Sequence, residues 1–301
     1  MLVNSACSHL RVGFIGFGEA ASGISRGLID EGIKSIKSYD IIQDKPIGEK
    51  LRKRAKTIGV ELVSLEALAK ESDVIISAVV CASAVQAAQS IVRHLSSRHI
   101  YVDINATSPI TKKEVANTLS PSGCKFVDAA VMNPVPPYLH KVAMMISGSG
   151  AEQFKTLMDP FHMNLTLVAG EAGTASSVKM LRSIFMKGMA ALFMEMLVAA
   201  YEMDIHELVL DTIRETLEKT APNQLIHRLV AGTAIHAGRR VHEMEEVIDT
   251  LKLAGVKPTM SSATREVLAW VDSFDLKSVF QGEMPQDYIT VLQEISNKRK
   301  S

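Results

Sequence analysis

The sequence has few cysteines and no net charge. Cysteine occurs only at Cys7, Cys81 and Cys124, too few and too scattered for a disulfide framework or a zinc site. The 33 Lys and Arg residues balance 33 Asp and Glu residues, so charge gives no reason to expect a nucleic acid or an anionic membrane as partner. We therefore expect a cytoplasmic protein that binds no metal.

The sequence also lacks a pattern for export or for membrane insertion. Its first ten residues, MLVNSACSHL, have neither the basic start nor the long apolar run of a signal peptide. The most apolar stretch, residues 185–203, carries Lys187 and Glu195 and never reaches about 18 uninterrupted apolar residues. We interpret this stretch as a buried helix of a globular protein.

Short apolar runs alternate with amphipathic segments over the first 170 residues. The runs rich in Val, Ile and Leu predict strands at 11–16, 35–40, 60–63, 73–80, 100–105, 125–131, 142–148 and 165–170. Helical segments are expected at 19–31, 45–58, 82–95, 109–119 and 151–162. This alternation predicts a doubly wound parallel sheet with helices on its faces.

The pattern changes after Gly170, where strand-like runs disappear. Helices are expected at 174–203, 206–219, 223–232, 235–254, 259–272 and 286–298. The chain therefore divides, by pattern, into an α/β domain of residues 1–170 and an all-α domain of residues 171–301.

A glycine motif follows the first predicted strand and opens the first predicted helix, the context that distinguishes a dinucleotide site from an ordinary turn. Gly16 would form the tight turn, Gly18 would let a pyrophosphate approach the backbone, and Ala21 would allow close packing of helix on strand. The helix N-terminus would add unpaired N–H groups for the phosphates. The motif predicts a Rossmann-type cofactor site formed by Gly16, Phe17, Gly18, Glu19, Ala20 and Ala21.

The second predicted strand ends at Asp40, which Ile41 follows. A carboxylate at this position can accept hydrogen bonds from ribose hydroxyls and would repel a 2′-phosphate. NAD is therefore the expected cofactor, and NADP is disfavoured.

Four segments give the chain a family resemblance along most of its length: GFIGFGEAASG (13–23), VDINATSP (102–109), FVDAAVMNP (126–134) and GEAGTASSVKM (170–180). They resemble motifs of the β-hydroxyacid dehydrogenases, relatives of 6-phosphogluconate and 3-hydroxyisobutyrate dehydrogenase. The resemblance implies that Lys179 is the catalytic acid/base. It further implies that Val80, Cys81 and Asn105 lie at the cofactor, and that Val131, Met132, Asn133 and Ser183 lie at the substrate.

The sequence departs from that family at the substrate motif. The family usually has Ser-Gly-Gly where this chain has Met132, Asn133 and Pro134. Methionine has no hydroxyl and proline has no N–H, so the hydrogen bonds that usually hold a substrate carboxylate in that family are altered here. A polar cluster at 236–246 offers an alternative, in which Arg239 and Arg240 hold an anion and His242 lies near the substrate. An ordinary solvated helix face explains the same cluster equally well.

The leading hypothesis is an NAD-dependent dehydrogenase of a small β-hydroxy acid or related hydroxy compound. Alternatives are a reductase of carbonyl or imine compounds and a non-catalytic dinucleotide-binding sensor. Imine reductases share this architecture but usually use NADPH and an acidic or tyrosine residue, so Asp40 and Lys179 count against that alternative. Because the helix at 174–203 is apolar around most of its circumference, burial against a second subunit is expected, which predicts a homodimer.

Overall fold

The computed structural model describes residues 10–300, so Cys7 lies outside the described part. The chain forms two compact units, and the division between them falls between Ile184 and Phe185. Both residues belong to one helix, α7 (Thr174–Glu202). The N-terminal unit contains the sheet, and the C-terminal unit is helical.

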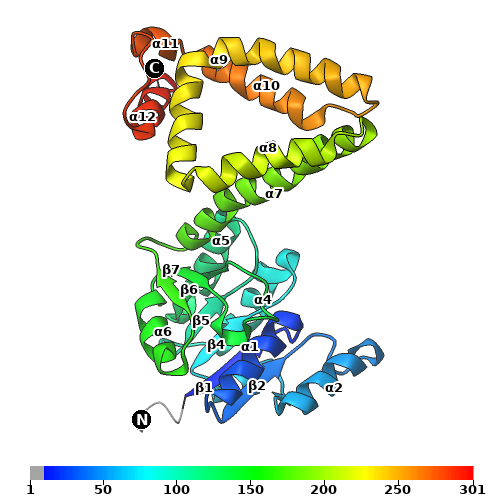
Figure 1. Cartoon of the computed structure of the whole chain (residues 1–301). Coiled ribbons are helices and arrows are strands. Elements are labelled where there is room, and N and C mark those ends of the chain that lie inside the picture. The colour runs from blue at the N-terminus through cyan, green and yellow to red at the C-terminus, as the bar shows by residue number, and fades with distance from the viewer. Residues whose placement is uncertain (1–9, 301) are drawn as a thin grey trace. The chain divides into compact units, whose positions relative to one another are not determined.

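The N-terminal unit is built on a sheet of eight strands in the order β3-β2-β1-β4-β5-β6-β7-β8 (Figure 1). The first six positions follow the order of a dinucleotide-binding Rossmann sheet. The eight predicted strands are confirmed with small shifts at their ends: β1 (Arg11–Ile15), β2 (Ser35–Tyr39), β3 (Glu61–Leu62), β4 (Val74–Ser77), β5 (Ile100–Asp103), β6 (Lys125–Val131), β7 (Met144–Ser147) and β8 (Leu165–Leu167).

The predicted doubly wound parallel sheet is confirmed as a mainly parallel sheet, in which the last two strands run opposite to the first six. Strand β7 pairs antiparallel with β6, and β8 pairs parallel with β7. The connection from β6 to β7 contains only the short 3-10 turn Leu139–Lys141. A parallel pairing usually needs a crossover helix. The residues 132–143 between β6 and β7 form no such helix, and the chain returns antiparallel alongside the strand it has just left.

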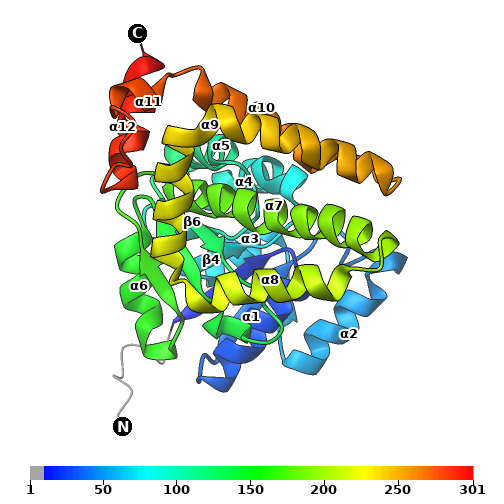
Figure 2. The ribbon, with the colours of Figure 1, turned by 45° about the horizontal axis from the view of Figure 1, so that its top comes forward.

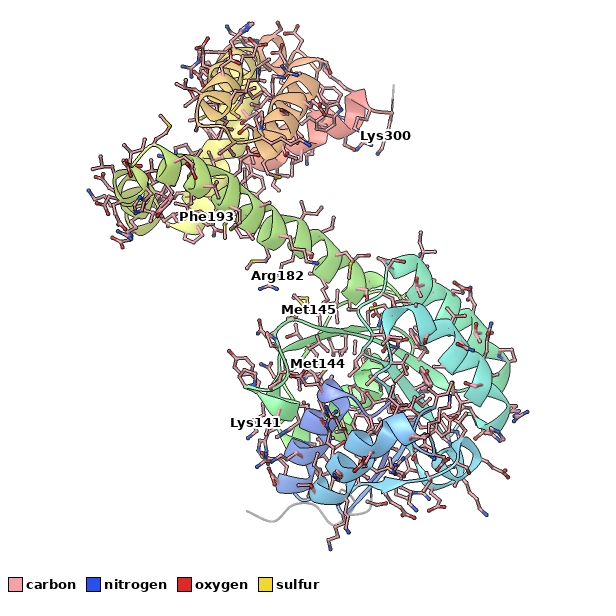
Figure 3. All side chains as sticks on the ribbon, turned by 90° about the vertical axis from the view of Figure 1, so that its right-hand side faces the viewer. Lys141, Met144, Met145, Arg182, Phe193 and Lys300 are labelled. Carbon is pink, nitrogen blue, oxygen red and sulfur yellow. The ribbon has the colours of Figure 1, made fainter. Side chains whose placement is uncertain are left out.

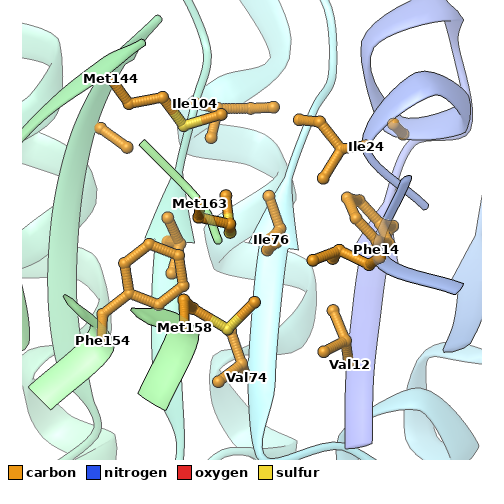
Figure 4. Packing of buried hydrophobic residues seen from close by; sticks show 14 of the residues in the cluster. Val12, Phe14, Ile24, Val74, Ile76, Ile104, Met144, Phe154, Met158 and Met163 are labelled. Carbon is orange, nitrogen blue, oxygen red and sulfur yellow. The ribbon is translucent and has the colours of Figure 1, made fainter. Parts of the chain in front are cut away.

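Helices cover both faces of the sheet. One face carries α1 (Glu19–Asp30), α2 (Glu49–Ile58) and α6 (Ala151–Met158), and the other carries α3 (Leu65–Glu71), α4 (Ala84–Ile91) and α5 (Pro109–Leu119). Helix α3 was not expected from the sequence. Figure 4 shows the first layer, in which Phe14 and Ile24 meet beside Val12. Burying each such side chain contributes roughly 1.5–3 kcal/mol, so both layers hold the sheet rigid.

The C-terminal unit contains the later part of α7 with α8 (His206–Lys219), α9 (Pro222–Leu253), α10 (Thr259–Asp272), α11 (Leu276–Val279) and α12 (Tyr288–Lys298). The helices expected at 223–232 and 235–254 are one helix, α9, which kinks at the non-helical residue His236 and visibly bends in Figure 1. Helix α10 packs along α9, as Figure 2 shows from another side. A small core holds this pair, formed by Ala234, Ala237, Val271, Leu276 and Val291.

Helix α7 corrects an expectation, because in the single chain it is not a buried helix. Phe185 is 63% exposed and Met194 is 66% exposed. Helix α8 beside it in sequence has no buried residue. By length and composition alone α7 is apolar enough to cross a membrane, but Glu195 within it accepts hydrogen bonds from the first turn of α10. Composition predicted an apolar helix correctly, whereas burial depends on what packs against it.

Candidate active site

The glycine turn joins β1 to α1 at the carboxyl edge of the parallel strands. Gly16 has φ +85°, and a Cβ there would lie 2.5 Å from the carbonyl oxygen of Ala78. Gly18 precedes the first turn of α1, and a Cβ there would meet no atom within 4 Å. The first glycine is therefore required by the fold itself, whereas the second leaves open space beside the amides at the start of α1. Open space at a helix N-terminus can accept a phosphate.

The other residues of the motif divide between the core and the surface. Phe17 and Ala21 are fully buried, Ala20 is half-buried, and Glu19 is exposed in the first turn of α1. The buried side chain of Phe17 therefore anchors the glycine turn in the hydrophobic core.

Asp40 ties the end of β2 to this turn. One carboxylate oxygen accepts a 2.8 Å hydrogen bond from the N–H of Phe17, and the other accepts a 3.0 Å bond from the N–H of Ile42. Each carboxylate oxygen has two acceptor sites, so Asp40 can still bind a ribose hydroxyl. Asp40 also lines the cavity beside Gly16 and Gly18.

Two cavities open along the same edge of the sheet. One, of about 400 Å³, is lined by Gly16, Gly18, Asp40 and Val80, among others. The second, of about 360 Å³, is lined by Ala20, Val80, Cys81, Asn105 and Val131. The structure therefore brings most of the predicted cofactor residues, and one predicted substrate residue, to one continuous stretch of the strand ends.

Asn105 holds the wall of the second cavity. Its side-chain oxygen accepts a 2.7 Å bond from the N–H of Val79, and its amide nitrogen donates to Ser77. Cys81 is an exposed free thiol whose Sγ donates to the carbonyl of Ala106 at 3.3 Å. The two turns after β4 and β5 are thereby bonded to each other.

The segment after β6 offers few donors to an anion. The N–H of Met132 is already bonded to the carbonyl of Ala143 at 2.9 Å, and Pro134 has no N–H. The carbonyl of Met132 accepts a 3.2 Å bond from Arg182 of α7, which is exposed (Figure 3). Asn133 alone keeps a side-chain donor beside this point.

Strands β6 and β7 anchor the start of α7. A carboxylate oxygen of Asp128 accepts hydrogen bonds from the N–H groups of Gly173 and Ser176 at 3.1 and 2.9 Å. The hydroxyl of Ser147 accepts one from the N–H of Ala175 at 3.0 Å. Helix N-termini leave such donors without backbone partners, so these side chains fix the end of the helix that carries Lys179.

Lys179, Arg182 and Ser183 follow within the next two turns of α7. Lys179 and Ser183 are both half-buried, and their spacing of four residues places them on one helix face. Arg182 lies one turn after Lys179. The structure therefore puts one amine, one guanidinium and one hydroxyl on the segment that β6 and β7 anchor.

A buried lysine beneath this site was missed from the sequence. Lys112, Asp103 and Asp128 are each 0% exposed, and the Lys112 ammonium lies 2.7 Å from Asp103 and 3.4 Å from Asp128. One pattern could have revealed it: Lys112 shares the inward face of α5 with Val115 and Leu119. A lysine at a core position of an amphipathic helix indicates a buried acidic partner.

The predicted residues of the helical domain belong to the C-terminal unit, on α9. Arg239 lies 3.2 Å from Glu243, His242 lies 3.2 Å from Glu245, and Arg240 bonds the hydroxyl of Thr233. His236 does not continue their helix face, because α9 kinks there. Among residues 10–300, no group of three or more His, Cys, Asp or Glu side chains is arranged to hold a metal ion.

Comparison with known proteins matches the chain in two parts. Residues 11–107 match the family described as NADP oxidoreductase, coenzyme F420-dependent, and residues 200–271 match a domain of unknown function. An uncharacterized 28.5 kDa protein of Methanothermus fervidus is 30% identical over 264 residues, which are 87% of this chain and 99% of that protein.

A solved structure, Conserved Protein MTH1747 of unknown function, is 34% identical with a TM-score of 0.61, over 91% of this chain and 100% of that chain. It is described as structurally similar to 3-hydroxyacid dehydrogenases. The chain belongs to the β-hydroxyacid dehydrogenase superfamily. Within that superfamily, it falls in the branch whose C-terminal helices match the domain of unknown function.

Imine reductases of known structure share the fold of this β-hydroxyacid dehydrogenase relative. The Myxococcus stipitatus imine reductase with NADP+ is 16% identical, with a TM-score of 0.70 over 87% of this chain and 94% of that chain. A variant of the same enzyme is in complex with NAD+. The chain is therefore an oxidoreductase-type NAD(P)-binding protein by fold, and these relatives include complexes with both dinucleotides.

Proposed function

We propose that this protein is an NAD-dependent dehydrogenase of a small hydroxy acid. A nicotinamide held at the glycine turn would supply the hydride acceptor for the substrate's CH–OH carbon. The amine of Lys179 would take the hydroxyl proton, so that the alcohol would leave as a carbonyl compound. The observation that carries this proposal is the anchoring of α7 on β6 and β7 by Asp128 and Ser147. It supports a Lys179 held by the sheet that carries the glycine turn.

The contact between Arg182 and Met132 supports an anionic substrate. Met132 and Pro134 supply no free N–H to a carboxylate. The Arg182 guanidinium has five N–H donors, of which one donates to the Met132 carbonyl. Among the described residues, no carboxylate lies within 4 Å of Arg182. Arg182 would bind the substrate carboxylate, and Ser183 and Asn133 would bind its other oxygens. Arg239, Arg240 and His242 remain proposed contacts from the C-terminal unit.

Asp40 supports NAD as the cofactor. A 2′-phosphate would meet a carboxylate that the N–H groups of Phe17 and Ile42 hold in place, and the loss of its ribose hydrogen bonds would add to the repulsion. NADP is accordingly disfavoured, in a protein that we place in the cytoplasm.

The uncovered apolar faces of the C-terminal unit support a homodimer. Met194 on α7 and Leu208 on α8 are 66% and 68% exposed, and α8 is amphipathic with no buried residue. Large apolar patches of this kind mark surfaces that bind another protein. A second copy presenting the same helices would bury both sets of faces.

A substrate panel tests the proposal. Purified protein with NAD is offered β-hydroxy acids and the matching neutral hydroxy amides, and the appearance of NADH is followed at 340 nm. We expect turnover of an acid and at least about tenfold lower kcat/KM for its amide, a preference that Arg182→Gln removes. Arg214→Gln, which replaces an exposed arginine of α8 paired with Asp211, is the matched control on the C-terminal unit.

Two results would contradict the proposal. Reduction of carbonyl or imine compounds, with no oxidation of any hydroxy acid, would favour a reductase. Tight nucleotide binding without turnover in either direction would favour a dinucleotide sensor.

A further inference from the structure

Lys112 lies at the centre of a fully buried charge cluster, at the carboxyl end of β5 and the adjacent middle of β6. Its ammonium donates to the backbone carbonyl and to a carboxylate oxygen of Asp103, both at 2.7 Å. A carboxylate oxygen of Asp128 lies 3.4 Å away. All three side chains are 0% exposed. Buried charges are tolerated only when they are paired and hydrogen-bonded, so neither carboxylate is independent of Lys112.

The two carboxylates support different parts of the site. Asp103 accepts a 2.8 Å bond from the N–H of Asn105, which leads to the cavity wall after β4 and β5. Asp128 accepts the N–H groups of Gly173 and Ser176 and a 2.6 Å bond from the hydroxyl of Ser176. One aspartate therefore holds the cofactor side, and the other holds the helix that carries Lys179.

We propose that Lys112 is a positioning residue that couples the Asn105 turn to the start of α7, with Asp103 and Asp128 as its two separate arms. Lys179 comes three residues after Ser176, so loosening the Asp128 arm displaces Lys179 while leaving the glycine turn intact. Loosening the Asp103 arm displaces the Asn105 wall. The effect on turnover rests on the proposed dehydrogenase function, whereas the effects on α7 and on nucleotide binding do not.

Asp128→Asn and Asp103→Asn form a matched pair. Both exchange a fully buried carboxylate beside Lys112 for an amide of the same size, and only Asp128 contacts α7. Three measurements are compared in the full-length protein: amide hydrogen exchange in a peptide spanning residues 170–181, the Kd of NAD from fluorescence, and kcat with the best hydroxy acid.

Asp128→Asn is expected to lose exchange protection in residues 170–181 and to lower kcat about 10- to 100-fold, with the Kd of NAD within twofold of the original. Asp103→Asn is expected to raise the Kd of NAD about tenfold and to leave exchange in residues 170–181 unchanged. Lys112→Met should show both effects. Ser176→Ala, which removes one anchor bond and no buried charge, should give a weaker form of the Asp128→Asn result if that variant does not fold.

Equal effects of Asp103→Asn and Asp128→Asn on all three measurements would overturn the proposal, because a merely structural charge cluster predicts equality. Unchanged exchange in residues 170–181 in both Asp128→Asn and Ser176→Ala would also overturn it. If no hydroxy acid is turned over by the original protein, the proposed function fails, and the exchange and nucleotide measurements still decide the role of Lys112.

Discussion

The two units bury their apolar residues to very different extents. In the N-terminal unit, helices cover both faces of the sheet, and β4 and β5 are buried along their whole length. In the C-terminal unit, α8 buries no residue and α7 exposes Phe185 and Met194. A unit with a closed core can hold a ligand in fixed geometry, whereas a unit with open apolar faces needs another surface to complete its burial. We therefore expect the cofactor geometry and the proposed site of assembly to belong to different halves of the chain.

The largest effect should come from the N-terminal side of α7. Lys179→Met keeps the apolar stem and removes the titrating amine, so kcat should fall by a factor of about 10²–10⁴. The Kd of NAD should change little, because the phosphates are expected at Gly16 and Gly18. Lys187→Met, farther along the same helix in the C-terminal unit, is the matched control. Near-normal turnover of Lys179→Met in steady-state assays would assign the proton to another group.

Assembly should depend on the C-terminal unit alone. Leu208→Glu places a charge on the uncovered face of α8, where the leucine is 68% exposed, and should weaken self-association about 10- to 100-fold. Ile110→Glu on α5, where the isoleucine is 79% exposed in the N-terminal unit, should change nothing. Sedimentation velocity at micromolar concentration measures both. A monomeric original protein would refute the dimer.

The two glycines of the turn should separate folding from binding within the N-terminal unit. Gly16→Ala forces a side chain into positive φ and against the Ala78 carbonyl, so the free energy of unfolding should fall by about 1–3 kcal/mol. Gly18→Ala meets no protein atom within 4 Å. It should keep stability and weaken NAD binding about tenfold or more by obstructing the pyrophosphate. Denaturant titrations and nucleotide titrations distinguish the two, and equal losses of stability would contradict this assignment.

Asp40 should set the nucleotide preference. In the original protein, NAD should bind more tightly than NADP by about 1–3 kcal/mol. Asp40→Asn keeps an acceptor for Phe17 and removes the charge, so the preference should shrink chiefly through tighter NADP binding. Fluorescence titration of both nucleotides checks this, and equal affinities in the original protein would show that Asp40 does not face the ribose.

The smallest effect should be a loss of stability in mild acid. Burial lowers the pKa of His140 below its usual range, against an opposing effect of Glu31. Below about pH 6.5, His140 binds a proton in the unfolded chain but stays neutral in the folded chain. The free energy of unfolding therefore falls as the pH drops below that value. We expect the urea midpoint to be lower at pH 5.5 than at pH 7.5, and His140→Gln to reduce this difference.

The free energy of unfolding should fall a second time at lower pH. Hydrogen bonds from Lys141 and His162 lower the pKa of Glu31 to about 2. This contribution to stability is complete above the unfolded value of about 4.5 and is lost as the pH falls from there toward 2. His140→Gln should leave this lower window in place, and its disappearance in that variant would contradict the separation of the two groups.

Local pattern was sufficient for most of the fold. Continuous apolar runs between helical segments predicted all eight strands, and the positive φ of Gly16 follows from a glycine placed where a strand turns directly into a helix. The start of α7 at Thr174 was also predicted from the residues next to it in sequence. These features depend on residues within about one turn or one strand of each other, so the sequence by itself determined them.

Tertiary structure alone decided the rest. Strand β7 pairs antiparallel with β6, and α9 kinks at His236; the local sequence pattern predicted neither feature. Lys112, Asp103 and Asp128 meet because the strand order places β5 beside β6 and α5 over them, which no local pattern states. The same holds for α7, whose composition predicted burial. Burial is a property of the surfaces that surround a helix, and a sequence of apolar residues specifies only that such surfaces are favoured.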